Sequence, residues 1–310
     1  MSIRKLNILL IGGSGFVSGT LARTALASGH AVWAVTRGQR LLPVGVTPIV
    51  VDRHDHAAFQ HTIEQLAMEW DLVVDCIGYT KQDAEQDIAV FRRRARHFVF
   101  ISTDFVYDPA KRRFPQSEES EHYLADGYGG QKRQCELTFL EHDTSPMAWT
   151  IVRPGHIYGP GSLLGCLPLH ARDPQLLNTL KAGQSLRLVG GGHFLQQPIL
   201  AQDLAQTILS CAGNPDAQNQ IFLTAGPDWI ESRDYYRIIA DLLGVDLRIE
   251  EVAVSEFLAA NPDRQSFLCH RINDLSKLRN AGLHVPATPI IEGLRQHVAS
   301  LLAQSTEEKA

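Results

Sequence analysis

The most constraining feature of the sequence is a glycine cluster between an apolar run and a helical pattern near the N-terminus. The run from Leu6 to Ile11 has the character of a buried parallel strand, and the helical pattern extends from about Gly15 to Ser28. Free N–H groups and the dipole at a helix N-terminus favour anions, and glycines let the backbone approach a pyrophosphate there. We therefore predict a dinucleotide-binding loop at Gly12, Gly15, Phe16 and Val17, with a purely structural turn as the alternative.

Strand-like and helical segments continue to alternate after this loop. Such alternation is typical of an α/β fold, here a Rossmann-type doubly wound parallel sheet. We expect a dinucleotide-binding domain over residues 1–155, with a return segment near 202–225, and a smaller mixed substrate domain over 156–304. The polar residues 305–310 are expected to form a flexible tail. The predicted strands are Leu6–Ile11, His30–Val35, Val46–Val51, Asp71–Cys76, His97–Ile101 and Trp149–Arg153.

Composition restricts the classes of protein to which the chain can belong. With 310 residues, 44% of them hydrophobic, and a net charge of −5, the chain is not a general nucleic-acid binder. Its five scattered cysteines favour neither a disulfide framework nor a zinc site, and we predict no metal. No signal peptide or long apolar run is apparent, which predicts a cytoplasmic protein with no membrane contact.

The ends of the second and third strands carry the signals for cofactor choice. Thr36 and Arg37 occupy the position where NAD-binding sheets commonly place an acid. An arginine there suits a 2′-phosphate, so NADP is favoured over NAD, although a solvent-facing arginine is the alternative. Asp52 is a candidate partner of the adenine amino group, or simply a turn residue before the next helix.

A tyrosine and a lysine four residues apart are the candidate catalytic pair. Tyr128 and Lys132 share one face of a helix expected from about Gly127 to His142, and they follow Thr103 by 25 and 29 residues. We expect Tyr128 to act as general acid and base. Lys132 would lower its pKa and hold the nicotinamide ribose, and Thr103 would hydrogen-bond the reacting oxygen.

These motifs resemble those of the extended short-chain dehydrogenases/reductases, the group of NAD(P)-dependent epimerases, dehydratases and reductases. The matching stretches are Gly12 to Val17, Phe100 to Tyr107, Tyr128 with Lys132, Arg153 to Pro160, and Asp203 to Ala205, in the order of that family. The resemblance covers nearly the whole chain. It implies a soluble enzyme that acts on a small molecule, and a homodimer is the assembly that such relatives often form.

Three departures from the family pattern narrow the reaction. Phe105 stands where sugar 4,6-dehydratases have a glutamate, so water elimination is disfavoured, although Asp104 is kept. Gln196 and Gln197 stand where many nucleotide-sugar enzymes carry a diphosphate-binding arginine, and an amide does not replace a guanidinium. Ser18 and the turn at Thr36 resemble an atypical branch that includes chloroplast RNA-binding relatives.

Five residues are further candidates for substrate contacts. They are Asp104, Phe105, His156, Tyr158 and His193. For His156 and Tyr158 a structural turn is an equal alternative, and His193 lies in a glycine-rich loop that suits a turn.

Two functions from different classes follow. The first is an NAD(P)-dependent oxidoreductase or epimerase that moves a hydride between nicotinamide and a secondary alcohol or ketone of a polar, possibly sugar-derived, substrate. The second is a non-catalytic dinucleotide-sensing or RNA-binding protein on the same fold. The basic cluster from Arg92 to Arg96 favours the second, and the complete set of Thr103, Tyr128 and Lys132 favours the first.

Overall fold

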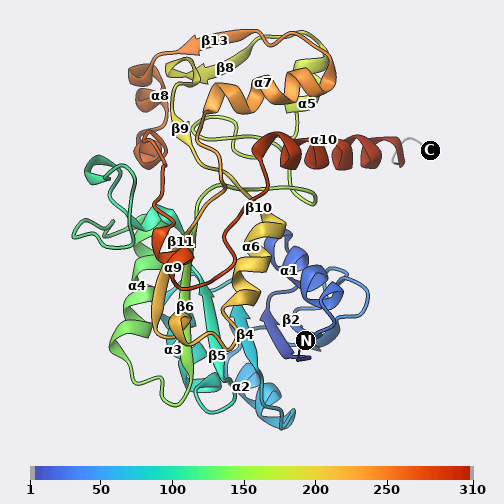
Figure 1. The fold of residues 1–310 in the computed structure, drawn as a ribbon, viewed down its shortest axis with the longest axis vertical. Coiled ribbons are helices and arrows are strands. Elements are labelled where there is room, and N and C mark those ends of the chain that lie inside the picture. Colours follow the sequence, from blue (N-terminus) through green and yellow to red (C-terminus); the bar gives the residue numbers. More distant parts are fainter. Residues whose placement is uncertain (1–3, 308–310) are drawn as a thin grey trace.

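The computed structural model describes residues 4–307, and its centre is a seven-stranded parallel sheet (Figure 1). The strand order is β11-β6-β5-β4-β1-β2-β3, so the fold is the doubly wound α/β type that the alternating pattern predicts. The strands are β1 (Asn7–Ile11), β2 (Ala31–Thr36), β3 (Thr47–Val50), β4 (Leu72–Asp75), β5 (His97–Ile101), β6 (Ala148–Pro154) and β11 (Gln220–Thr224).

Helices cover both faces of this sheet, as Figure 1 shows. On one face, α1 (Phe16–Ala27) and α6 (Ala201–Ser210) pack side by side over a core of aliphatic residues such as Leu10, Leu21 and Ile208. On the other face lie α2 (His56–Gln65), α3 (Lys81–Phe91) and α4 (Gly127–Glu141), over a more aromatic core. The later segments α6 and β11 therefore lie in or against the sheet of the N-terminal strands.

The chain reverses direction across the sheet between β1 and β4. From β1 it builds outward through β2 and β3, and from β4 it builds the other way through β5, β6 and β11. Ile11 pairs with Val35 on one side and with Asp75 on the other. Loops leave in opposite directions at such a switch point and open a crevice beyond the strand ends, where ligands of this fold class bind.

A smaller lobe of mixed structure covers these strand ends. Its core contains Tyr158, Tyr235, Tyr236 and Leu294. Its short strand pairs, β8 with β13, β9 with β12 and β7 with β10, are not visible as patterns in the sequence. The lobe contains β7 (Ile157–Tyr158), α5 (Leu176–Lys181), β8 (Leu186–Val189), β9 (Leu195–Gln196), β10 (Ile199–Leu200), β12 (Ile230–Glu231), α7 (Ser232–Leu243), β13 (Ile249–Val252), α8 (Val254–Ala260) and α10 (Ile290–Glu307).

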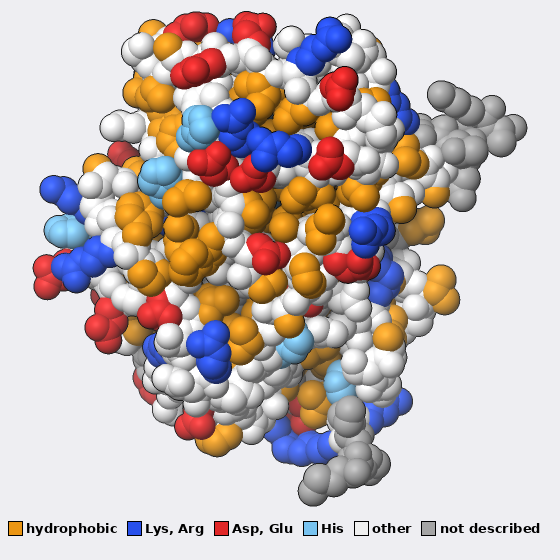
Figure 2. Space-filling view, turned by 45° about the horizontal axis from the view of Figure 1, so that its top comes forward, with side chains coloured by type: hydrophobic (Ala, Val, Ile, Leu, Met, Phe, Trp, Pro, Cys, Tyr) orange, Lys and Arg blue, Asp and Glu red, His pale blue; other side chains and the backbone are white. Residues whose placement is uncertain are grey.

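Two further observations concern the ends and surface of the chain. The predicted tail from 305 is helical as far as Glu307, and residues 308–310 lie outside the described residues. Within residues 4–307, no helix combines the length and the apolar character needed to cross a membrane. Figure 2 shows acidic and basic side chains interspersed on the face that it presents, without a single basic field.

Candidate active site

The glycine loop brings the N-terminus of α1 against the neighbouring strands. Gly12 has φ of 84°, and a Cβ there would lie 2.9 Å from Cγ2 of Ile77. A Cβ on Gly13 would overlap that of Ala34. The hydroxyl of Ser18 accepts a hydrogen bond from the Gly15 amide at 3.1 Å, which closes the loop onto the first turn of α1. The residues present therefore fit a pyrophosphate at this helix N-terminus.

A cavity of about 730 Å³ extends from this loop to the catalytic candidates. Its wall contains Gly15, Phe16, Val17, Thr103, Phe105, Tyr128, Lys132 and His156. The first three come from the glycine loop and the start of α1, and the others follow β5, open α4 or follow β6. The fold thus brings together residues up to 158 positions apart in the chain, Ser14 and Arg172, in one space.

Tyr128 stands at the start of α4 and is half exposed to the cavity. Burial of the phenol raises the pKa of Tyr128 to about 12, whereas its hydrogen bond with Thr103 acts in the opposite direction. Phe105 packs against the Tyr128 ring with 6.2 Å between centroids. The phenol is consequently protonated at neutral pH and is paired with the threonine that the sequence predicts.

Lys132 is buried beneath the floor of the cavity. Its Nζ donates hydrogen bonds of 2.7 Å to the carbonyl oxygens of both Gly78 and Ile101. Burial lowers the pKa of this ammonium, and the nearby Asp75 carboxylate opposes the effect. Two of the three protons of Lys132 are thus directed to backbone carbonyls, and its effect on the pKa of Tyr128 stays a prediction.

Tyr79 is a site residue that the sequence patterns do not reveal. It follows β4, and its ring lies 6.4 Å from that of Tyr128 and 4.9 Å from Nζ of Lys132. The ring therefore covers the ammonium on the side of the cavity. Its position between β4 and α3, two residues before the helix, is the only signal for it in the sequence.

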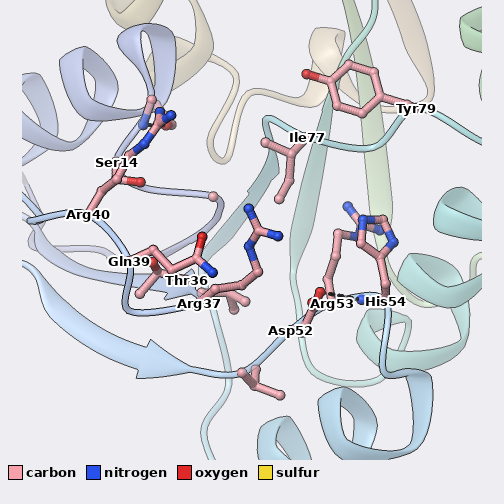
Figure 3. A pocket seen from close by; sticks show the side chains of 15 residues that line it. Ser14, Thr36, Arg37, Gln39, Arg40, Asp52, Arg53, His54, Ile77 and Tyr79 are labelled. Atoms are coloured by element: carbon pink, nitrogen blue, oxygen red, sulfur yellow. Dashed lines mark hydrogen bonds between the residues drawn. The ribbon is translucent and has the colours of Figure 1, made fainter.

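A second cavity, of about 340 Å³, lies beside the glycine loop at the ends of β2 and β3 (Figure 3). Arg37 points into it, and Arg40, Asp52, Arg53 and His54 lie around it. Arg53 is buried, and its guanidinium bonds to Asp75 at 2.7 Å and Asp87 at 3.0 Å. Arg37 and Arg40 are exposed and form no ion pair with any residue of the described part of the chain. Their charges are thus available to a ligand.

Asp52 lines the second cavity, where an adenine partner is expected, and it also stabilises the turn before α2. Its Oδ1 accepts a hydrogen bond of 3.0 Å from the backbone amide of His54. Asp52 therefore orders the turn before α2 and lines the second cavity at the same time.

Three predicted substrate residues lie away from the larger cavity. Asp104 is buried and forms ion pairs with Arg112 at 3.0 Å and Arg271 at 2.6 Å. Tyr158 is buried in the core of the smaller lobe. His193 is exposed and contacts Glu231 at 3.0 Å. Contacts within the protein thus engage all three side chains, and their contact with a substrate stays a prediction.

Phe105 and His156 do line the larger cavity. The Phe105 ring lies under the guanidinium of Arg271, 3.8 Å from its central carbon, and against Phe267. Burial, assisted by the charge of Arg172, lowers the pKa of His156 to about 4, so its imidazole is neutral. The wall beside Tyr128 is thus aromatic, and no carboxylate is available there for water elimination among the residues that line the cavity.

Comparison with known proteins agrees with this geometry. The sequence profile of the NAD dependent epimerase/dehydratase family matches residues 8–225, and the chain belongs to that family. This confirms the resemblance found in the sequence.

Individual relatives are distant. The chain is 25% identical, over 72% of its length and 59% of the relative's, to the chloroplast stem-loop binding protein of 41 kDa b of Arabidopsis thaliana. It thus spans less than two thirds of that relative. It is 24% identical, over 76% of its length and 75% of the relative's, to a UDP-glucose 4-epimerase of Vibrio cholerae. The fold is similar to that of a dTDP-glucose 4,6-dehydratase from Bacillus anthracis in complex with NAD, with a TM-score of 0.78, 16% identity, and coverage of 97% and 98% of the two chains.

Proposed function

We propose that the protein is an NADP-preferring oxidoreductase or epimerase that moves a hydride between nicotinamide and a secondary alcohol or ketone. The observation that carries this proposal is the shared cavity: Tyr128 and Thr103 lie in the same space as the glycine loop at the N-terminus of α1. Membership of an NAD-dependent family supports the same class of cofactor. The nicotinamide, when bound, supplies or accepts the hydride.

Tyr128 and Thr103 provide the proton chemistry of the proposed reaction. The phenol donates its proton to a carbonyl oxygen during reduction, or removes one from a hydroxyl during oxidation. Because burial raises the pKa of Tyr128 to about 12, the donating form predominates at neutral pH. Thr103 holds the oxygen that gains or loses the proton. Lys132 supplies positive charge beneath this pair and a donor for a ribose hydroxyl.

The preference for NADP is supported by Arg37 and Arg40. Both lie at the smaller cavity, where the ribose 2′ position belongs if the pyrophosphate lies on α1. Their guanidinium groups suit a phosphate better than a neutral hydroxyl. A reductase must exchange this cofactor with solvent, whereas an epimerase retains it. Mass spectrometry of the purified protein, before and after denaturation, distinguishes these two cases.

A nucleotide diphosphate is a poor match for the surroundings of Gln196 and Gln197. Gln197 is buried, donates to the carbonyl of Gly226 at 2.8 Å and accepts from the amide of Asn273 at 2.8 Å. The Gln197 amide thus holds two loops together, and neither glutamine carries a positive charge. We therefore propose a smaller polar substrate than a nucleotide sugar.

The variant Tyr128→Phe tests the proposal. It should bind NADP⁺ with unchanged affinity but reduce turnover by roughly a hundredfold or more, as expected for loss of a general acid or base. Turnover is followed by NADPH absorbance with a ketone that the wild-type protein reduces. Thr103→Val should show a smaller loss in the same direction. Undiminished turnover by Tyr128→Phe would refute the assignment of the proton donor.

A non-catalytic RNA-binding protein is the second candidate, because one relative is described as a stem-loop binding protein. In the structure, Arg92 of the basic cluster is paired with Asp143 at 3.3 Å, and Arg96 approaches Asp71 at 3.8 Å. Salt-sensitive binding to a stem-loop RNA, lost when Arg92, Arg93, Arg94 and Arg96 are neutralised together, would favour this candidate.

A further inference from the structure

Arg172 has an unusual backbone conformation in the loop between β7 and α5. Its φ is 61°, in the left-handed region that non-glycine residues seldom adopt. The loop is fixed on both sides of it. The amide of Asp173 donates to the carbonyl of Leu164 at 2.7 Å, and the carboxylate of Asp173 contacts Nδ1 of His170 at 2.8 Å. Strained conformations of this kind persist where the surrounding structure enforces them, and they are common in ligand clamps.

The side chain of Arg172 reaches the larger cavity. Its guanidinium carbon lies 5.9 Å from the ring centroid of Phe16, at the start of α1, and Arg172 is part of the cavity wall. Arg172 is exposed, and its side chain has no hydrogen bond or ion pair with the residues whose side chains the structure describes, 4–304. Its charge also acts on the phenols of Tyr79 and Tyr128 and on the imidazole of His156. The guanidinium of Arg172 therefore lies at the end of the cavity that contains Tyr128 and His156.

No carboxylate in the described lining of the cavity competes with a bound anion for the guanidinium of Arg172. Its described lining contains three cationic side chains, Arg40, Lys132 and Arg172, and no aspartate or glutamate. Lys132 is engaged by two backbone carbonyls, and Arg40 also borders the second cavity beside the glycine loop. Arg172 is the cation left for a group bound next to Tyr128. The wall also contains apolar side chains, among them Phe105, Leu163 and Leu167.

We propose that Arg172 determines substrate specificity by binding a carboxylate or phosphate group of the substrate, beside the carbon whose oxygen faces Tyr128. This inference rests on the proposed function and adds the class of substrate, an organic anion that carries a ketone or secondary alcohol. A guanidinium binds either anion through paired hydrogen bonds. The pyrophosphate of the cofactor has its own site at the N-terminus of α1, so it does not require Arg172.

Binding of inorganic phosphate to protein saturated with NADP⁺ tests this inference without any substrate. The bound cofactor fills the pyrophosphate and 2′-phosphate sites. Added inorganic phosphate can therefore bind only in the part of the cavity that the cofactor leaves free. We expect weak binding, measured by ³¹P line broadening of free phosphate. The variant Arg172→Gly removes the guanidinium and suits the φ of 61°. It should weaken phosphate binding by about tenfold, as expected for loss of a charge-assisted hydrogen bond, while the Tm stays equal or rises.

The control is Arg93→Ala, which removes an exposed arginine at the far end of α3 and should leave phosphate binding unchanged. Arg172→Lys should restore part of the affinity. The inference is overturned if wild-type protein with NADP⁺ does not bind phosphate, or if Arg172→Gly binds it as well as wild type. It is also overturned if Arg172→Gly weakens NADP⁺ binding by the same factor, because Arg172 would then serve the cofactor. None of these outcomes depends on the activity of Tyr128.

Discussion

The carboxylate of Glu136 and the guanidinium of Arg153 form a fully buried two-point ion pair, with Nε bonded at 2.8 Å and Nη2 at 2.7 Å. Glu136 lies one turn after Lys132 on α4, and Arg153 lies near the end of β6. Ser102, just before Thr103, donates to the same carboxylate at 2.6 Å. The helix that carries Tyr128 and Lys132 is thus tied to the ends of β5 and β6.

Removal of one partner should therefore destabilise the protein strongly. Glu136→Gln leaves the Arg153 charge buried without its counter-ion, and such a change costs about 3–5 kcal/mol. The free energy of unfolding, measured with urea at pH 7, should fall by this amount. The control Glu141→Gln, at an exposed position on the same helix, should have little effect. Equal stability of the two variants would show that Glu136 does not hold α4 in place.

Acidification should destabilise the protein through its buried histidines. Burial lowers the pKa of His97 to about 4, and burial together with Arg172 does the same for His156. The unfolded chain, with histidine pKa near 6.5, binds more protons than the folded one in this range, so stability falls as pH decreases from about 6.5 to about 4. For His97, which is buried, the loss amounts to about 3 kcal/mol once the pH is below about 4.

Urea unfolding at several pH values checks this expectation. His97→Gln should reduce the slope of stability against pH between about 6.5 and 4.5, whereas His61→Gln, at an exposed position, should retain it. A slope that is the same in His97→Gln and wild type would exclude His97 as a source of the acid sensitivity.

The parts of the structure that depend on local pattern were predictable from the sequence. The buried strands of the parallel sheet are continuous apolar runs such as Leu72 to Val74, and the glycine loop follows from the steric need for Gly12 and Gly13. The placement of Tyr128 and Thr103 at one cavity follows from helical spacing and from the position of strand ends in this fold class.

Contacts between distant segments were not predictable in the same way. Asp104 resembles a substrate ligand in the sequence, but its partner Arg271 lies 167 residues away. The ring of Phe105 lies between Tyr128 and Arg271 for the same reason. The role of Arg172 depends on a loop conformation with positive φ; the following Asp173-Pro174 indicates a turn but not which side chain enters the cavity. The conformation of the loops determines which distant residues come into contact. Hydrophobic periodicity predicts helices and strands but not these contacts.

Close packing between α4 and the turn after β5 gives a further prediction. A Cβ on Gly129 would overlap the carbonyl oxygen of Phe105, so Gly129→Ala should push α4 away from Thr103. Misplacement of a reacting group by about 1 Å can reduce turnover about a hundredfold. NADPH oxidation assays should show this loss, and urea unfolding a destabilisation of about 1–3 kcal/mol.

The control for Gly129→Ala is Gln131→Ala, two residues along the same helix at an exposed position. It should retain both turnover and stability. Wild-type turnover in Gly129→Ala would mean that the turn at Phe105 moves without disturbing the pair of Tyr128 and Thr103.

The choice between NADP and NAD should depend on Arg37 and Arg40. Both are exposed at the smaller cavity, and the structure records no acidic partner for either within residues 4–307. A charge-assisted hydrogen bond to a phosphate contributes about 1.5–3 kcal/mol. Arg37→Ser and Arg40→Ser should each weaken NADP⁺ binding by about tenfold to a hundredfold, with NAD⁺ binding changed little. Calorimetric titration of both cofactors measures the ratio, which should fall further in high salt because exposed charges are screened. If wild-type protein binds NAD⁺ as tightly as NADP⁺, or if the two serine variants weaken both cofactors equally, these arginines do not recognise a 2′-phosphate and the enzyme uses NAD.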